Sequence, residues 1–415
     1  MKLYILRGRI MNNPIFLSRI VLRNYKSISA CSVRLGPLTF LVGPNGAGKS
    51  NFLDALRLIA ESLNTSLEHA LRERGGINEV RRRSSGHPTN FGIRLEFRIS
   101  ENITGWFAFS VGAMKKGGFE VQEEGCHVVG PELNNHSFYR IQEGNLIESS
   151  EKVMPPVAND RLYLVAAAGI PKFREVYNTL SHMGFYNLNP DSIRELQPPD
   201  TGFLLRRDGE NIASVLNLME KEDKETYNKV MEFLSKVVPG VKGVTVKHMG
   251  KKETLEFRQV VGTNVTPWRF PAENMSDGTL RALGVLTALY QSFGEGERRI
   301  PFVGIEEPEV AVHPGAAGVL RDALIAASRN VQIIVTSHSP DILDDKDISD
   351  EWILGVVNEN GDTKIGPIDA SSRNAIKDRL YTAGELLRFN QLGPDTETIN
   401  KIPPAQLELF GGVWE

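Results

Sequence analysis

The chain reads Phe-Leu-Val-Gly-Pro-Asn-Gly-Ala-Gly-Lys-Ser-Asn at residues 40–51, and this stretch decides the fold. An apolar run typical of a buried strand leads into a turn with three glycines, and an apolar-periodic segment typical of a helix follows. Because glycine has no Cβ, consecutive backbone N–H groups can point inward and surround phosphate oxygens. The stretch is a P-loop, and it predicts a nucleotide at the start of a helix.

The residues of this loop have distinct expected roles. Lys49 is expected to reach the β- and γ-phosphates, and Ser50 to place its hydroxyl on Mg²⁺. The backbone and side chains expected to contact the nucleotide are those of Asn45, Gly46, Ala47, Gly48, Lys49, Ser50 and Asn51.

Composition narrows the possible function classes. The 415 residues carry a net charge of −3, so any contact with nucleic acid must come from a local patch rather than from a generally basic surface. The two cysteines, Cys31 and Cys126, have no metal-ligand spacing and form no disulfide framework, which favours a reducing compartment. No apolar run has bilayer-spanning length and no signal-peptide pattern is visible. We therefore expect a cytoplasmic protein without a membrane partner.

Coarse periodicity divides the chain into segments. Alternating apolar residues from Ile15 to Val42 predict strands that open the nucleotide-binding sheet. Short alternating runs between residues 93 and 141 predict an antiparallel β lobe, and helical periodicity takes over between residues 171 and 238. Strand character returns at residues 244–257. The predicted fold class is α/β.

A second motif completes the candidate site. The apolar run at residues 300–305 ends in Glu306 and Glu307, as in a Walker B strand. Adjacent carboxylates at a strand end can serve one Mg²⁺ shell and one attacking water. We assign Glu306 to the metal and Glu307 to the water. Glu306 departs from the aspartate that most such strands carry at this position.

Two further motifs lie on either side of the Walker B strand. Ser276, Asp277 and Gly278 precede an apolar-periodic helix and resemble an ABC signature motif, although an isolated Ser-Asp-Gly is also a common helix cap. Donors at such a helix start can bind γ-phosphate oxygens. His338 follows the apolar strand at residues 331–335 and is similar to the switch histidine that holds the attacking water.

In this order the motifs resemble those of the SMC/RecF/OLD-like branch of ABC-type ATPases, and the chain is similar to stand-alone members with an AAA_21-type domain. The resemblance implies an ATPase head with a mixed sheet, an antiparallel β lobe and a helical insertion. It also implies ATP and Mg²⁺ as cofactors, and a homodimer in which Ser276, Asp277 and Gly278 close on the other chain's P-loop. The chain departs from the pattern by lacking a recognisable Q-loop glutamine and a long coiled coil.

The resemblance places the domain boundaries as follows. Residues 14–165 form the N-terminal half of the head with the P-loop and β lobe, residues 166–240 the helical insertion, residues 241–365 the C-terminal half with signature, Walker B and switch histidine, and residues 366–415 a tail that could dock a partner.

Two functions follow from the resemblance. One is an ATPase whose hydrolysis drives a DNA-related process, either repair or defence against phage and plasmid DNA. For that function the best candidate phosphate contacts are the arginines at positions 72, 74 and 81–83, although a solvated loop is the preferred explanation of this cluster. The alternative is a nucleotide-gated scaffold that regulates a separate nuclease or toxin partner.

Overall fold

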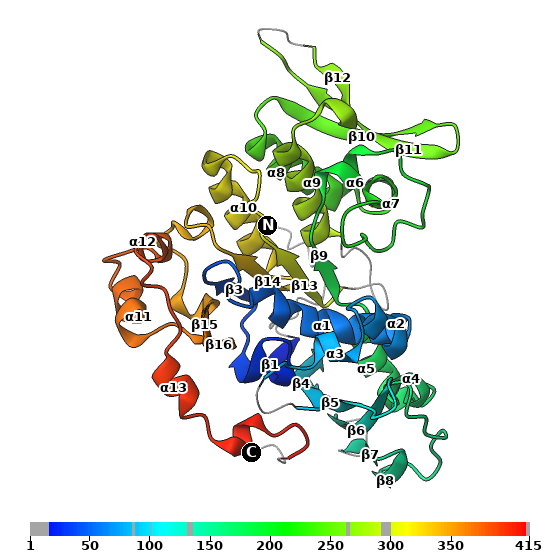
Figure 1. The fold of residues 1–415 in the computed structure, drawn as a ribbon. Coiled ribbons are helices and arrows are strands. Elements are labelled where there is room, and N and C mark those ends of the chain that lie inside the picture. The colour runs from blue at the N-terminus through cyan, green and yellow to red at the C-terminus, as the bar shows by residue number, and fades with distance from the viewer. Residues whose placement is uncertain are drawn as a thin grey trace, which may run out of the picture.

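The computed structural model describes residues 16–84, 88–100, 102–130, 136–262, 266–291 and 300–411. Within these ranges the strands form three sheets, and helices pack between and against them (Figure 1). The start of the chain and Trp414 of the predicted docking tail lie outside the described residues. No helix of the described ranges is long and apolar enough to cross a bilayer. The α/β class with a mixed sheet is confirmed.

A six-stranded mixed sheet forms the centre of the molecule. Its order is β16 (Asp362–Pro367), β15 (Ile353–Glu359), β3 (Leu38–Val42), β14 (Gln332–Ser337), β13 (Phe302–Glu306) and β9 (Gly184–Tyr186). All neighbouring pairs are parallel except β15 and β16. Strands β3 and β14 are buried along their whole length, as expected for parallel strands covered on both faces. The parallel pairing brings the carboxyl ends of β3, β14 and β13 to one edge.

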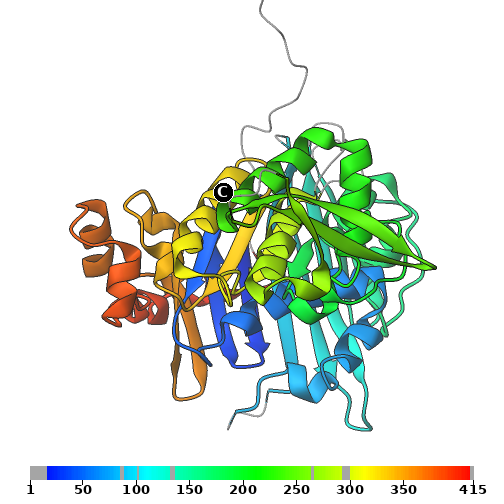
Figure 2. The same cartoon turned by 90° about the horizontal axis from the view of Figure 1, so that it is seen from above.

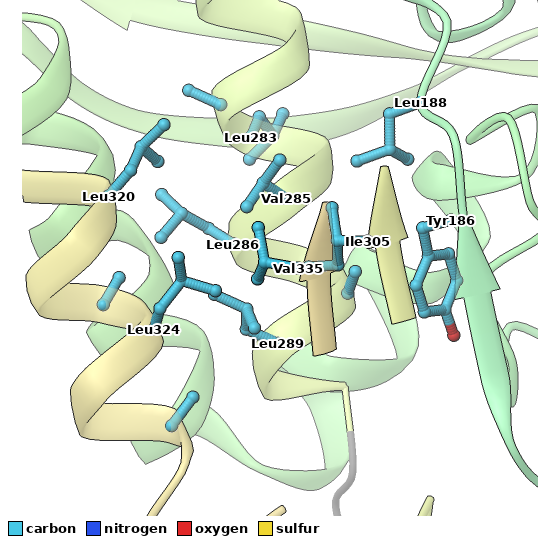
Figure 3. Close-up of a cluster of buried hydrophobic side chains, with 14 of the residues drawn as sticks. Tyr186, Leu188, Leu283, Val285, Leu286, Leu289, Ile305, Leu320, Leu324 and Val335 are labelled. Atoms are coloured by element: carbon cyan, nitrogen blue, oxygen red, sulfur yellow. The ribbon is translucent and has the colours of Figure 1, made fainter. Parts of the chain in front are cut away.

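Helices cover both faces of this central sheet. One face packs with α1 (Lys49–Asn64) and α5 (Pro171–Ser181), and the other with α9 (Asp277–Tyr290) and α10 (Pro314–Ala327). Figure 3 shows leucines of α9 and α10, such as Leu286 and Leu324, meeting Ile305 and Val335 of the strands. All four of these side chains are at most 1% exposed. This apolar layer fixes the start of α9 relative to the end of β13.

An antiparallel sheet forms the predicted β lobe. Its order is β2 (Ile28–Arg34), β1 (Leu17–Tyr25), β4 (Asn90–Ser100), β5 (Ile103–Ala113), β6 (Phe119–Val129), β7 (Ser137–Gln142) and β8 (Asn145–Ser149). The expectation that β1 and β2 open the nucleotide-binding sheet is wrong, because both strands pair within the lobe and only β3 enters the central sheet. Their alternating pattern suits a sheet with one covered face. Two short helices, α2 (Leu67–Arg72) and α3 (Ile77–Val80), follow α1.

The segment predicted as a helical insertion, residues 166–240, contains helices and one strand of the central sheet. After α4 (Leu164–Ala167) and α5, strand β9 pairs in parallel with β13. Helices α6 (Pro190–Arg194), α7 (Ile212–Glu222) and α8 (Lys224–Val237) follow. They carry a three-stranded antiparallel sheet of β10 (Val241–Met249), β11 (Lys252–Gln259) and β12 (Trp268–Pro271), which projects at one end of the molecule (Figure 1).

The C-terminal segment packs on the same chain. Helices α11 (Ala370–Lys377), α12 (Ala383–Arg388) and α13 (Thr396–Asn400) lie beside the β15–β16 hairpin, at the edge opposite β9 (Figures 1 and 2). Leu409 then packs on Val21 and Ala108 of the lobe, and Arg94 donates to the carbonyl of Leu409 at 2.9 Å. Leu386 and Leu392 are also buried, whereas Phe389 is 61% exposed, so only part of the apolar surface of this segment packs on its own chain.

One buried carboxylate joins the lobe to the first helix of the following segment. Glu124 of β6 is fully buried, and its carboxylate accepts hydrogen bonds from the Tyr139 hydroxyl at 2.7 Å and from the backbone N–H groups of Tyr163 at 2.6 Å and Leu164 at 2.7 Å. Burial raises the pKa of Glu124 to about 7, and the three donors only partly oppose that shift.

This pKa predicts a stability that falls as pH rises. Between the ordinary glutamate pKa and about 7 the folded chain holds a proton on Glu124 that the unfolded chain releases, so the free energy of unfolding decreases with pH across that window. Glu124→Gln removes the titration. We expect the stability of Glu124→Gln relative to wild type to rise by roughly 1–3 kcal/mol from pH 5 to pH 8.

The measurement is urea unfolding at each pH, with Glu148→Gln as the control because Glu148 lies on the exposed strand β8. A stability difference between Glu124→Gln and wild type that stays constant from pH 5 to pH 8 would contradict the assignment.

Candidate nucleotide-binding site

Three motifs meet at the edge formed by the carboxyl ends of the central strands. The P-loop follows β3, His338 follows β14, and Glu306 is the last residue of β13. Ser337 lies opposite Val42, and Thr336 lies opposite Glu306. In parallel sheets ligands bind beyond these strand ends. Sheet pairing thus places together residues that are up to about 290 positions apart in the chain.

The P-loop glycines have the backbone geometry that a phosphate cradle needs. Gly46 and Gly48 adopt φ angles of 76° and 106°, which side-chain-bearing residues rarely take. A Cβ on Gly43 would lie 2.0 Å from the carbonyl oxygen of Val356 in β15. Asn45, Gly46 and Ser50 are exposed at the mouth of the loop. The loop is closely packed on its protein side and open on the other.

The hydroxyl groups of Ser27 and Thr363 support the P-loop on its protein side. Thr363 of β16 donates to the carbonyl of Ala47 at 2.8 Å, and its hydroxyl lies 2.7 Å from that of Ser27. Asn51 donates to the Ser27 hydroxyl at 2.7 Å. The sequence analysis missed Ser27 and Thr363, since neither belongs to a motif and only the fold brings them under the P-loop.

Lys49 is a buried cation that faces carboxylates. Its side chain is nearly covered, and its Nζ donates to the carbonyls of Gly43 at 2.7 Å and Pro44 at 3.1 Å. Burial lowers the pKa of Lys49, whereas the nearby charges of Glu307 and Glu309 raise it. A phosphate oxygen could replace these loop carbonyls as the partner of the ammonium group.

Glu307 and His338 are in direct contact. Nδ1 of His338 lies 3.0 Å from Oε1 of Glu307, and both side chains are partly exposed. The backbone of Glu307 has φ 45°, and its N–H donates to the Thr336 carbonyl at 3.0 Å. This left-handed conformation is uncommon for a residue other than glycine, so the backbone of this turn is constrained. The arrangement can hold a water molecule between a carboxylate and an imidazole.

Glu306 has a different partner. Its Oε1 lies 3.0 Å from Nη2 of Arg207, which comes from the loop between α6 and α7. Sequence reasoning missed Arg207, because no spacing rule connects that loop with the end of β13. The loop is held in place by backbone bonds from Asn187 to the Arg207 carbonyl and from Asn189 to the Asp208 carbonyl. Segment 187–189 directly follows β9, the neighbour of β13.

Two more buried charges surround the Walker B turn. Glu309 accepts a hydrogen bond from the Ser337 hydroxyl at 2.5 Å, and burial raises the pKa of its carboxyl group. Arg281 of α9 donates to the carbonyls of Glu306 at 3.2 Å and Glu307 at 3.0 Å. Burial lowers the pKa of Arg281, and the three neighbouring glutamates oppose this. Sequence reasoning did not single out Glu309 or Arg281, because their contacts exist only in the folded chain.

The candidate signature motif lies at the start of α9. Ser276 is its N-cap and accepts from the Thr279 N–H at 3.3 Å, while Asp277 pairs with Arg194. A Cβ on Gly278 would lie 2.3 Å from the carbonyl oxygen of Ala311, so α9 approaches the loop after Walker B closely. Ser276 and Asp277 are exposed, and in the described ranges the hydrogen bonds of their side chains run to α9 and Arg194, not to the P-loop.

The arginines proposed as phosphate contacts do not form an open patch. Arg74 is buried against Asp54 and Glu61, and Arg82 pairs with Asp362 at 2.7 Å. The others have local partners: Arg72 contacts His69, Arg81 bonds Asn78 and the Pro88 carbonyl, and Arg83 pairs with Glu79. The planar guanidinium suits such bridging of carboxylates. Arg74 and Arg82 therefore stabilise the fold, whereas Arg72 and Arg83 are exposed, and contact of these two with phosphates stays a prediction.

The residues around the P-loop fit a magnesium nucleotide. In the described part of the chain no group of three or more His, Cys, Asp or Glu side chains could hold a metal ion unaided. Mg²⁺ in nucleotide sites instead takes one or two protein ligands plus phosphates and water. The exposed Ser50 hydroxyl and the partly exposed Glu306 carboxylate supply the oxygen ligands such an ion uses.

Comparisons with known proteins agree with this geometry. The family model described as "AAA domain, putative AbiEii toxin, Type IV TA system" matches residues 38–110 and 266–344, the two segments that hold the P-loop and the other three motifs. The OLD nuclease of Thermus scotoductus is 24% identical over 449 aligned residues, which cover 96% of this chain and 79% of that protein.

Shorter matches and solved structures extend the comparison. The RecF protein of Magnetococcus marinus is 39% identical over 84 residues, which are 20% of this chain and 22% of that protein. A structure of an SMC head bound to the C-terminal winged-helix domain of ScpA superposes with a TM-score of 0.54 and 13% identity, covering 86% of this chain and 99% of the other. At that identity the similarity establishes the fold alone.

The contact between Arg207 and Glu306 predicts a measurable competition. Arg207→Ala removes the positive charge that a metal ion would have to displace from Glu306. A partly exposed ion pair contributes up to about 1 kcal/mol. We therefore expect the Mg²⁺ concentration for half-maximal binding of a fluorescent ATP analogue to fall by about two- to fivefold.

Arg206→Ala provides the matched control, since Arg206 pairs with Asp200 and Glu210 instead. An unchanged or higher Mg²⁺ requirement in Arg207→Ala would show that the ion pair does not compete with the metal.

Proposed function

We propose that the chain is an SMC/RecF/OLD-like ABC-type ATPase that binds ATP with Mg²⁺, dimerises on ATP, and couples hydrolysis to a DNA-related process such as repair or defence against phage or plasmid DNA. The observation that carries the proposal is the convergence of Lys49, Glu307 and His338 at three adjacent strand ends. A binding module without hydrolysis would not require the Glu307–His338 contact.

The geometry supports a distinct role for each of Lys49, Glu307 and His338. Lys49 exchanges its two loop carbonyls for phosphate oxygens and neutralises the charge that develops on them. Glu307 accepts the proton of the water that attacks the γ-phosphate, and the products are ADP and inorganic phosphate. His338 holds the carboxylate from 3.0 Å and orients it toward that water. Bound Mg²⁺, held through Ser50 and Glu306, would supply charge neutralisation of the phosphates.

The exposure of the P-loop mouth and of the signature residues supports dimerisation. The mouth of the P-loop is open, and the exposed Ser276 and Asp277 make their side-chain contacts elsewhere in the chain. A second chain could place its signature helix on the first chain's nucleotide, where the α9 N-terminus would favour the γ-phosphate. Arg281 connects that helix to the carbonyls of Glu306 and Glu307. Loss of the γ-phosphate would then be transmitted to the dimer contact.

The link to DNA is supported by the relatives' names rather than by the site. A matched relative is named as a nuclease and others as DNA replication and repair proteins. The second candidate is a nucleotide-gated scaffold for a separate nuclease or toxin partner, favoured by the toxin in the description of the matching family model. Both candidates require ATP binding through Lys49, so DNA dependence of turnover separates them.

The test is ATP turnover of wild type and Glu307→Gln, with and without double-stranded DNA, together with light-scattering mass. We expect at least about a hundredfold loss of turnover in Glu307→Gln, because proton transfer by a positioned base contributes on this scale. ATP should convert this variant to a stable dimer. DNA should raise the wild-type rate several-fold.

Each of these three expected results can fail separately. Turnover that persists in Glu307→Gln would reject Glu307 as the base, and a monomer in the presence of ATP would reject the dimer. Turnover indifferent to DNA, together with a co-purifying partner protein, would favour the scaffold. Lys49→Ala is the reference without nucleotide binding.

A further inference from the structure

The small sheet β10–β12 concentrates positive charge in a chain that is negative overall. Residues 241–271 contain six lysine and arginine residues against two glutamates, a net charge of +4 compared with −3 for the whole chain. The basic residues are Lys242, Lys247, Lys251, Lys252, Arg258 and Arg269, and all six are exposed. Because the whole chain has a net negative charge, a site that binds a polyanion must be a local basic patch, and this region is such a patch.

The register puts Lys247, Arg258 and Arg269 on the solvent face. Val244, Leu255 and Phe257 are buried toward α7 and α8. Residues with the opposite parity face outward, and Gly243, Arg258 and Arg269 lie in one row across the three strands. Lys247 lies on the same side, because its Nζ is 3.5 Å from Glu256, which is also 3.6 Å from Arg269.

This face carries more positive charge than its own acid can balance. Within the described residues of the sheet, Glu256 is the carboxylate shared by Lys247 and Arg269, while the other glutamate, Glu253, is buried and bonded to Ser214. Arg258 and Arg269 are direct cross-strand neighbours, an arrangement of like charges that destabilises a sheet. An external anion would relieve this repulsion.

The position of the sheet fits an extended partner. Trp268 and Phe270 stack with ring centroids 6.4 Å apart, but Phe270 pairs with the buried Phe257, so these rings lie on the face opposite the arginine row. The sheet projects beyond the helices at the end of the molecule opposite the β lobe, so a long polyanion can reach it (Figure 1).

We propose that the outward face of β10–β12, through Lys247, Arg258 and Arg269, binds the phosphate backbone of double-stranded DNA. This inference rests on the proposed DNA-linked function and gives it a location. The sheet is joined to the ATP site, because β12 continues through the 3₁₀ turn Ala272–Asn274 into Ser276. Backbone bonds between Glu253 and Gln197 also join β11 to the segment that precedes Arg207. DNA on this face would therefore contact elements leading to both halves of the nucleotide site.

The experiment measures binding of a labelled 30-base-pair duplex by fluorescence anisotropy over a salt series. The variant replaces Lys247, Arg258 and Arg269 with alanine. We expect at least tenfold weaker binding and a log–log salt slope that is smaller by about 3, since each lost phosphate contact removes nearly one unit. ATP binding by this variant should equal that of wild type, which also confirms that it folds.

The control replaces Lys221, Lys224 and Lys236 with alanine on the neighbouring helices α7 and α8. It changes the net charge equally but leaves the sheet intact. Wild-type DNA affinity in the sheet variant, or an equal loss of affinity in the control, would overturn the proposal while leaving ATP turnover and dimerisation untouched.

Tighter binding of single-stranded RNA through the same three residues would overturn the assignment of DNA as the ligand. Failure of wild type to bind duplex DNA would overturn this proposal and the DNA part of the proposed function, but not the ATPase assignment.

Discussion

The parallel pairing of β3 with β14 and of β14 with β13 is the constraint on which the rest of this fold depends. It brings one lysine, two glutamates and one histidine to the same edge from three separate parts of the chain. Both faces of these strands pack against helices, so a shift in register would disrupt close packing on both sides. The geometry of the site is therefore a consequence of core packing.

Charge inside the site is balanced by near neighbours. Lys49 faces Glu307 and Glu309, Glu306 faces Arg207, and Arg281 faces backbone carbonyls at the Walker B turn. A buried charge without a partner would cost several kcal/mol, so these groups stabilise one another in the described conformation. Ligands that bring phosphate and metal change these partners. Since Arg207 and Arg281 belong to different elements, such a change would reach both the α6–α7 loop and α9.

The P-loop depends equally on an element far away in the sequence. Thr363 and Val356 of the β15–β16 hairpin pack against its backbone, and Gly43 and Gly48 allow this close approach. The C-terminal helices lie along the same hairpin, and the following segment covers part of the lobe sheet. A glycine loop is conformationally permissive on its own. Here its shape is set by contacts with β15, β16 and Ser27.

The sequence by itself determined three features: the P-loop, the acidic strand end at Glu306 and Glu307, and the α/β class with an antiparallel lobe. These are local patterns whose spacing reflects backbone geometry. Only the tertiary structure decided which residues the site side chains contact. In the fold, Glu307 contacts His338, Glu306 pairs with Arg207, and Thr363 donates to the P-loop backbone. Strands β1 and β2 pair within the lobe and not in the expected nucleotide-binding sheet. The fold also makes Arg74 a buried partner of Asp54 and leaves Arg258 and Arg269 exposed side by side. A charged side chain has the same appearance in a sequence whether it bridges buried carboxylates or faces water, because the distinction depends on which distant residues the fold brings within a few ångströms.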